Sequence, residues 1–251
     1  MFDQVGWTLP DAWRLLADCQ LQREFRPAEY RHVRSTGMQI VSDGWVDARR
    51  SINVRYSRVQ SSRIDVATLM IYPVVAADRL PIFGAEWVVV SGRCHLAVLD
   101  VEVAGAQPEL FASLQHQFAP LAARWQPIFP EREEVPEWFR EIGTPWALCS
   151  ACDLDRLPQL RQAYADYLRL AVEGWYAPAC LADHSNKSSR ESAPEHPAVL
   201  AYKQHHFEHS PGRKLLSKDF APEFVDAFLR DWHFGPCQSA ESLGPRSEFA
   251  E

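Results

Sequence analysis

The chain lacks long apolar runs, a disulfide framework and the glycine-rich motifs of nucleotide-binding proteins. No apolar segment among its 251 residues approaches the roughly 20 residues that a membrane-spanning helix needs. The first residues show no basic region followed by an apolar stretch, so we expect no signal peptide. The six cysteines are scattered through a chain of middle size, which favours reduced thiols in a cytoplasmic protein.

Motifs for phosphate binding, acyl transfer and metal binding are also missing. The sequence contains no GxxxxGK[ST], no GxGxxG after a strand and no GxSxG. A helix would place His205 and His209 one turn apart, but the HExxH order of zinc proteases is not present. Cys149 and Cys152 form a single CxxC pair without a second pair at a suitable distance. We therefore expect no metal.

The net charge of −7 argues against general nucleic-acid binding, but the charge is unevenly distributed. Residues 47–63 carry five arginines against one acid, Asp47. A second basic group follows near the C-terminus: Arg213, Lys214 and Lys218. Charge alone favours a solvated strand edge, and the alternative is a basic face that steers an anionic partner.

The order of predicted elements indicates an α/β fold, a three-layer α/β/α sandwich with a central, mostly antiparallel β-sheet. Strands are expected over residues 38–103, with a short strand at 146–149. Helices are expected at 9–25, 107–125, 157–175, 198–209 and 220–232. We predict one domain over residues 1–235, a mobile surface loop at 183–197 and a disordered tail at 236–251.

A single carboxylate interrupts the middle one of three apolar runs that predict a β-meander. The runs are of strand length and cover Ile64–Tyr72, Ala85–Val90 and Leu96–Val101. Glu86 lies in the middle run, just after Phe83 and Gly84. An acid among apolar neighbours is costly to ionise unless it has a partner or a chemical role. Glu86 is therefore the leading candidate, and pairing with an arginine such as Arg55 is the alternative.

Two segments of the chain resemble the ferredoxin-dependent bilin reductases. The first reads strand, Tyr72-Pro73, loop, Leu80-Pro81-Ile82-Phe83-Gly84, an acid-bearing strand and then Leu96-Ala97-Val98-Leu99-Asp100. The second is similar to the closing helix pattern of that family and runs from Tyr202 through Phe220-Ala221-Pro222-Glu223-Phe224 to His233-Phe234. The resemblance covers most of residues 50–103 and 198–235, and the family has the α/β/α sandwich that the element order predicts.

The resemblance implies an enzyme without a permanently bound cofactor that binds a linear tetrapyrrole between the sheet and the C-terminal helices. Reduced ferredoxin would supply electrons one at a time, side chains would supply protons to a bilin radical, and haem oxygenase would supply the substrate, typically biliverdin. We therefore expect a monomeric cytoplasmic oxidoreductase of phycobilin biosynthesis, with ferredoxin and the bilin as partners and no nucleic acid or membrane.

The resemblance also assigns residues by position. The central family Asp falls on Glu86, which is one methylene longer, and the C-terminal helix Asp falls on Ser210. A position that is His or Asn in different product types falls on Thr68. The His-x-Glu pair of the phycocyanobilin type falls near Val54 and Tyr56, so that proton relay is missing. Fewer donors imply one two-electron reduction rather than two.

From this mapping we predict two sets of site residues and keep the alternatives open. The catalytic set is Glu86, His209 and Ser210. The substrate-binding set is Tyr56, Thr68, His95, His206 and Arg213. The alternatives are a non-catalytic protein that binds a bilin or haem catabolite, a reductase of another open-chain tetrapyrrole in the manner of chlorophyll-catabolite reductases, and a zinc hydrolase.

Overall fold

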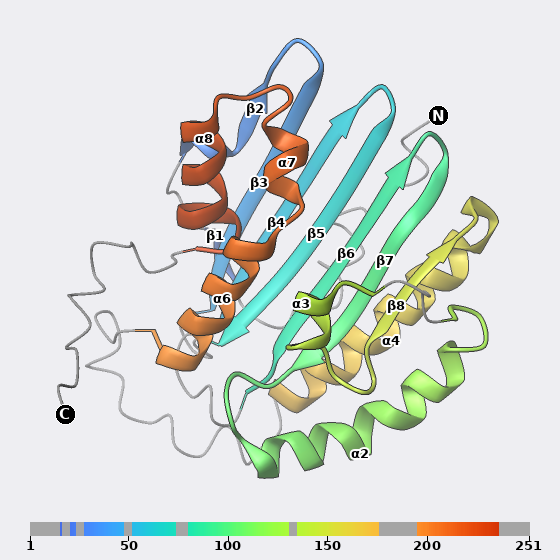
Figure 1. Ribbon diagram of the computed structural model, residues 1–251. Coiled ribbons are helices and arrows are strands. Elements are labelled where there is room, and N and C mark those ends of the chain that lie inside the picture. Colours follow the sequence, from blue (N-terminus) through green and yellow to red (C-terminus); the bar gives the residue numbers. More distant parts are fainter. Residues whose placement is uncertain are drawn as a thin grey trace, which may run out of the picture.

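An eight-stranded antiparallel sheet forms the middle layer of the protein, as the computed structural model shows (Figure 1). The structure describes residues 16, 21–23, 28–47, 52–73, 80–130, 135–175 and 195–235. The strand order is β1-β3-β4-β5-β6-β7-β8, with β2 also paired to β3. The strands are β1 (Gln22–Arg23), β2 (His32–Arg34), β3 (Met38–Asp47), β4 (Ile52–Ser61), β5 (Ile64–Pro73), β6 (Ile82–Val90), β7 (Arg93–Glu102) and β8 (Leu148–Cys152).

The strands from β3 to β7 follow one another in space as they do in sequence, each antiparallel to the last. The turn between β6 and β7 consists of Ser91 and Gly92, with φ angles of 49° and 82°. Positive φ at both central residues is the backbone of the two-residue hairpin turn that matches the natural twist of paired strands. The antiparallel sheet predicted over residues 38–103 is confirmed.

Two long helices, α2 (Pro108–Trp125) and α4 (Leu157–Trp175), cover one face of the sheet (Figure 1). Their apolar stripes pack against alternate residues of the strands and form the largest core cluster. Within it, the rings of Phe83 on β6 and Tyr164 on α4 meet edge to face, with centroids 5.7 Å apart. Both helices agree with the sequence-based prediction.

Shorter helices cover the opposite face: α3 (Glu137–Arg140), α6 (Pro197–His209), α7 (Gly212–Leu216), α8 (Pro222–Ala227) and the π-helix η6 (Phe228–His233). Two 3-10 turns, η3 (Ala28–Tyr30) and η4 (Leu154–Arg156), complete the described elements. Since helices bury both faces of the sheet, its strands are apolar on both sides. The predicted three-layer sandwich is confirmed. None of the described helices is long and apolar enough to cross a membrane.

Several element boundaries differ from the sequence-based expectation. The helix expected at 9–25 falls mainly outside the described residues, and Gln22–Arg23 form β1 because they pair with Val46 and Trp45 of β3. The helix expected at 220–232 is divided, since the N–H of Phe234 donates to the carbonyl of Leu229, five residues earlier, at 3.0 Å. The tail at 236–251 and most of the loop at 183–197 lie outside the described residues.

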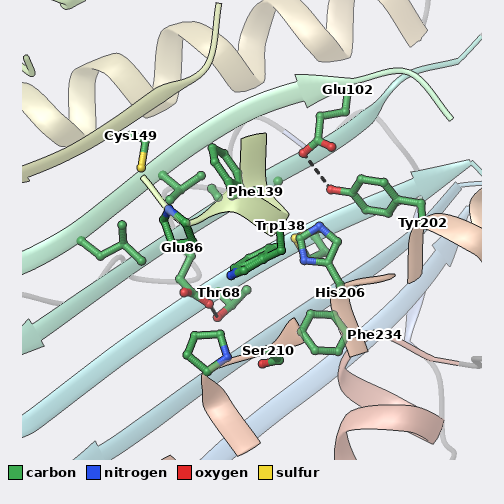
Figure 2. Close-up of a pocket in the computed structure, with 17 residues that line it drawn as sticks. Thr68, Glu86, Glu102, Trp138, Phe139, Cys149, Tyr202, His206, Ser210 and Phe234 are labelled. Atoms are coloured by element: carbon green, nitrogen blue, oxygen red, sulfur yellow. Dashed lines mark hydrogen bonds between the residues drawn. The ribbon is translucent and has the colours of Figure 1, made fainter. Parts of the chain in front are cut away.

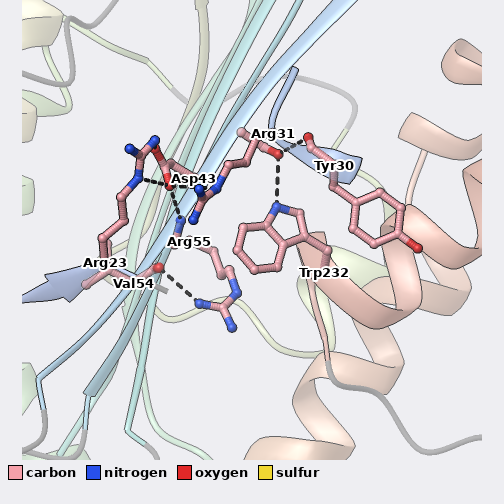
Figure 3. A network of polar contacts seen from close by, with 9 residues as sticks. Arg23, Tyr30, Arg31, Asp43, Val54, Arg55 and Trp232 are labelled. Atoms are coloured by element: carbon pink, nitrogen blue, oxygen red, sulfur yellow. Dashed lines mark hydrogen bonds and ion pairs between the residues drawn. The ribbon is translucent and has the colours of Figure 1, made fainter. Parts of the chain in front are cut away.

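The η6 helix is attached to the sheet through the indole of Trp232 (Figure 3). Its Nε1–H donates to Ser42 Oγ of β3 at 2.9 Å, and that hydroxyl donates in turn to the carbonyl of Tyr30 at 2.5 Å. The guanidinium of Arg55 lies 4.6 Å from the centroid of the same indole, a cation–π arrangement. These contacts fix the position of η6 against β3 and β4.

Helix α6 carries a fully buried lysine, Lys203. Its ammonium pairs with the carboxylate of Glu195, lies 3.4 Å from the carbonyl oxygen of Gly235 and sits 4.5 Å from the ring centroid of Tyr72 on β5. A buried charge is tolerated only with such partners. Lys203 therefore fixes α6 against both the sheet and the end of η6.

Substitution of Trp232 by Phe is expected to lower the free energy of unfolding by at least about 1–2 kcal/mol, because a buried hydrogen bond is lost and the smaller phenyl ring leaves part of the space of the indole unfilled. Urea denaturation would measure the change. The same substitution in a Ser42→Ala background should cost less, since the acceptor is already gone. Equal costs in both backgrounds would show that the hydrogen bond contributes nothing.

Candidate functional site

A cavity with a volume of about 160 Å³ opens between the sheet and the shorter helices (Figure 2). Its floor is the exposed face of β5, β6, β7 and β8, and its walls come from α3, α6 and the residue after η6. The lining residues that the argument uses are Thr68, Glu86, Glu102, Trp138, Tyr202, His206, Ser210 and Phe234.

Glu86 projects from β6 into this cavity and is half-buried. Its register partner on β5 is Thr68, whose hydroxyl donates to Glu86 Oε2 at 3.0 Å. Burial raises the pKa of the Glu86 carboxyl, and the hydrogen bond from Thr68 opposes that rise. Two residues predicted from the sequence therefore meet, and the alternative of an ion pair between Glu86 and Arg55 is wrong, since the Arg55 guanidinium binds Asn53 and stacks on Trp232.

A second carboxyl, that of Glu102 on β7, lines the same cavity and was not predicted. Its side chain is 3% exposed, and Tyr202 on α6 donates its hydroxyl to Glu102 Oε1 at 2.7 Å. Burial, and then the charge of Asp100, raise the pKa of Glu102 well above its ordinary value. The signal was available: in Asp100-Val101-Glu102 the two acids are two apart, so a strand places both on one face.

Asp100 holds the segment that follows α3. Its carboxylate accepts hydrogen bonds from the backbone N–H of Thr144 at 2.9 Å and from the hydroxyl of Thr144. Burial raises the pKa of Asp100 to about 6, although these hydrogen bonds oppose the rise. The clasp between Asp100 and Thr144 joins β7 to the chain just after α3, and α3 supplies Trp138 and Phe139 to the cavity wall.

His206 is the imidazole that lines the cavity, and it is neutral. Burial, and then the nearby His205, His233 and His209, lower its pKa to about 3. The ring packs 4.6 Å from that of Tyr202 and 5.5 Å from that of Phe234, measured between centroids. Its Nε2 is buried without a hydrogen-bond partner in the described part of the chain. His206 can exchange hydrogen bonds with a ligand but does not carry a positive charge near neutral pH.

Ser210 and His209 end helix α6 at the rim. Ser210 lines the cavity, and its Oγ accepts the backbone N–H of Gly212 at 3.1 Å. His209 does not line the cavity: its exposed ring stacks on Trp138, with centroids 6.4 Å apart. Among the described residues, no group of three or more His, Cys, Asp or Glu could hold a metal ion.

Three predicted substrate-binding residues lie away from the cavity. Tyr56 packs against the α2–α4 core, because strand alternation directs it to the opposite face of β4. His95 is exposed, beside an irregularity in the pairing of β7 with β8. Arg213 pairs with Asp226, and its guanidinium lies 4.6 Å from the ring centroid of Phe207.

The first basic strip is also smaller than the sequence suggested. Arg55 is buried, and Arg58 forms two hydrogen bonds with the fully buried carboxylate of Asp65, at 2.8 and 2.6 Å. Arg63 remains at the surface and donates to Ser91 Oγ at 3.2 Å. Arg49 and Arg50 lie outside the described residues. Arg55 and Arg58 therefore stabilise the sheet rather than present charge to a partner.

The cavity suits a largely apolar molecule that can pack against aromatic side chains. Aromatic and aliphatic side chains form most of its surface, and no Lys or Arg is among the described lining residues. Two acids with raised pKa values face the space from the sheet, and a neutral imidazole faces it from α6. Such groups can deliver protons where water is largely excluded.

Comparisons with known proteins agree with this chemistry. The model of the ferredoxin-dependent bilin reductase family matches residues 14–235. A phycoerythrobilin:ferredoxin oxidoreductase from Synechococcus sp. (strain RCC307) is 25% identical over 215 residues, covering 78% of this chain and 75% of the relative. The enzyme of the same name from Parasynechococcus marenigrum (strain WH8102) is 26% identical over 157 residues, covering 60% of this chain and 57% of the relative.

A solved structure shares the fold. The crystal structure of phytochromobilin synthase from tomato, determined in complex with biliverdin, superposes with a TM-score of 0.73 at 14% identity, covering 93% of this chain and 83% of that one. The family match spans almost the whole described region and includes both segments whose motifs carry the resemblance. The chain therefore belongs to the ferredoxin-dependent bilin reductase family.

Proposed function

We propose that the protein reduces a linear tetrapyrrole, biliverdin or a dihydrobiliverdin, with reduced ferredoxin as the electron donor. Membership of the family supports the reaction class. The observation that carries the proposal is the Glu86 carboxyl, which faces a largely apolar cavity and whose pKa is raised by burial. A cytoplasmic location, a monomeric state, a role in phycobilin biosynthesis and supply of the substrate by haem oxygenase remain predictions.

Binding would place the conjugated rings in the cavity and the two propionates at its mouth. Trp138, Phe139 and Phe234 offer aromatic surface to the pyrroles. Burying a carboxylate without a cation is costly, and the described lining residues supply no cation, so the propionates stay in contact with solvent. His206 and Tyr202 give polar contacts at the α6 wall.

The reaction requires one proton to be transferred to the bilin for each electron that it receives. Each reduced ferredoxin gives up one electron, and the bilin radical that results gains basicity and takes a proton. Glu86 can donate that proton because burial raises its pKa and so favours the protonated carboxyl, and Thr68 orients Oε2 by its hydrogen bond. The carboxylate left behind is costly in this environment, so it recovers a proton from solvent before the next turnover.

The same cavity fits a protein that binds a bilin without reducing it. Ser210 replaces an acid at the position where the family resemblance expects one, and its Oγ is already engaged with the N–H of Gly212. A serine hydroxyl is far less acidic than a carboxyl, so this position offers no proton donor. A reductase would change the bound bilin when reduced ferredoxin is added, and a binding protein would not.

Anaerobic absorbance spectroscopy tests the proposal directly. The purified protein mixed with biliverdin is expected to give a shifted pigment spectrum, which changes to that of a reduced bilin after reduced ferredoxin is added. Chromatography of the product would identify the double bond that is reduced. A tight complex that stays unchanged under reduction would establish the binding protein, and the lack of any complex would exclude both.

Replacement of Glu86 by Gln is expected to slow bilin reduction by roughly 10²–10⁴-fold, the usual contribution of a general acid. Gln keeps the size of the side chain and still accepts the hydrogen bond from Thr68, so the affinity for biliverdin should change little. Absorbance titration gives the affinity, and single-turnover kinetics with reduced ferredoxin gives the rate. Unchanged turnover would rule out Glu86 as the donor.

The rate of proton delivery should fall as pH rises through the raised pKa of Glu86, because only the protonated carboxyl can donate. Since the Thr68 hydroxyl lowers that pKa, Thr68→Val should move the fall to higher pH. Stopped-flow measurements over a pH series would record both profiles, with bilin affinity measured at each pH as the control. A shift of the Thr68→Val profile to lower pH would contradict this assignment.

A further inference from the structure

We propose that Glu102, held by Tyr202, is a second proton donor that faces the same cavity as Glu86. The inference rests on the proposed function and extends it by naming where the second proton of a two-electron reduction comes from. The resemblance did not name Glu102, and the spacing of Asp100 and Glu102 shows only that the two acids share one face of β7. The geometry of Glu102 in the structure carries the assignment, and the chemistry of its surroundings supports it.

The two carboxyls serve different parts of the cavity. Across the β6–β7 pair, Glu86 is opposite Val98 and Ile82 is opposite Glu102. Val98 and Glu102 are four residues apart on β7, which corresponds to roughly 13 Å at about 3.4 Å per residue. A molecule long enough to touch both acids must extend along the strands, as an open-chain tetrapyrrole can.

Gly84 leaves the floor between the two acids open. It lies on the cavity face of β6, between Ile82 and Glu86, and lines the cavity itself. A Cβ at this position would meet the sulfur and methyl of Met70 at 3.4 Å and Glu102 Oε1 at 3.8 Å. Any larger side chain would therefore occupy the space through which a ligand reaches Glu102.

The hydrogen bonding of Glu102 involves only one of its two carboxyl oxygens. Oε1 accepts the Tyr202 hydroxyl at 2.7 Å, so the proton of the neutral carboxyl belongs on Oε2. Oε2 is buried and has no hydrogen-bond partner among the described residues. An unpaired buried polar group is costly, and a basic atom of a ligand in the cavity would remove that cost. The raised pKa of Glu102 keeps the proton available.

Two donors balance the reduction of one double bond. Two reduced ferredoxins supply one electron each, Glu86 supplies one proton and Glu102 supplies the other. Two carboxyl O–H bonds break, two bonds from hydrogen to the bilin form, and two oxidised ferredoxins and two carboxylates remain. Solvent then returns a proton to each carboxylate. This count agrees with a single two-electron reduction per turnover.

Two matched variants separate a catalytic role from a structural one. Glu102→Gln keeps the acceptor for the Tyr202 hydroxyl but lacks an acidic proton. Tyr202→Phe removes the hydrogen bond but leaves the carboxyl, and since that bond lowers the pKa of Glu102, its proton is retained. Single-turnover absorbance kinetics under anaerobic conditions, with biliverdin and reduced ferredoxin, would compare both with the wild type and with Glu86→Gln.

A donor role predicts that Glu102→Gln takes up the first electron normally and then slows completion of the reduction by roughly 10²–10⁴-fold. Bilin affinity of Glu102→Gln should stay within a few-fold of the wild type. Tyr202→Phe, which loses the hydrogen bond that lowers the pKa of Glu102, should move the fall of this completion rate to higher pH. A Glu102→Gln variant that completes the reduction at the wild-type rate, or a Tyr202→Phe profile that does not move, would show that the pair only supports the wall and would overturn the inference.

Infrared spectroscopy gives a readout that does not depend on turnover. The wild type should show the C=O stretching band of a protonated carboxyl near neutral pH, and Glu102→Gln should remove part of it. A wild type that reduces biliverdin while its Glu102→Gln variant reduces it equally fast would overturn the second donor and leave the proposed function intact. A wild type that never reduces biliverdin would overturn both, even where the infrared band confirms a protonated Glu102.

Discussion

Carboxyl groups withdrawn from water on one face of the sheet impose the main physical constraint on this structure. Glu86, Asp100 and Glu102 all project toward the layer of short helices, and burial raises the pKa of each. The partners that the structure gives them are hydroxyls and backbone N–H groups rather than cations. Such surroundings favour the neutral form of a carboxyl, so the fold itself shifts Glu86 and Glu102 toward the protonation that the chemistry requires.

The three acids differ because their partners differ. Asp100 accepts three hydrogen bonds from Val101 and Thr144, and its pKa is raised only to about 6. Glu102 has the single hydroxyl of Tyr202 and lies beside the charge of Asp100, and its pKa is raised well above its ordinary value. The two carboxyls therefore have different roles: Asp100 binds the chain after α3, and Glu102 faces the cavity.

Sequence reasoning was most successful where the signal is local. Apolar runs and the positions of helical stripes predicted β3 to β7, α2 and α4, because those patterns report directly on burial. Glu86 was found for the same reason, as an acid inside an apolar strand. Glu102 was missed because its character depends on Tyr202, a residue 100 positions away in sequence that no local pattern brings near.

The errors at the site also have a common cause. To predict that a strand residue contacts a ligand, one must know which face of the sheet its side chain occupies. A shift of one position along the strand places the side chain on the other face. Tyr56 lies on the opposite face for this reason, whereas the structure shows that Thr68 and Glu86 are register partners on the cavity face. Arg213 was read from its charge, but charge does not reveal that Asp226 already neutralises it.

The buried ammonium of Lys203 has a consequence for how the cavity wall can evolve. Successive residues of a helix are separated by about 100° of rotation, so the position of Lys203 fixes the angle at which every other α6 side chain leaves the axis. The ion pair between Lys203 and Glu195 fixes the rotation of α6 about its axis. Tyr202 and His206 therefore both point into the cavity. Gain or loss of one residue between Lys203 and His206 would turn the imidazole out of the wall, whereas changes in length beyond His209 would leave that aim intact.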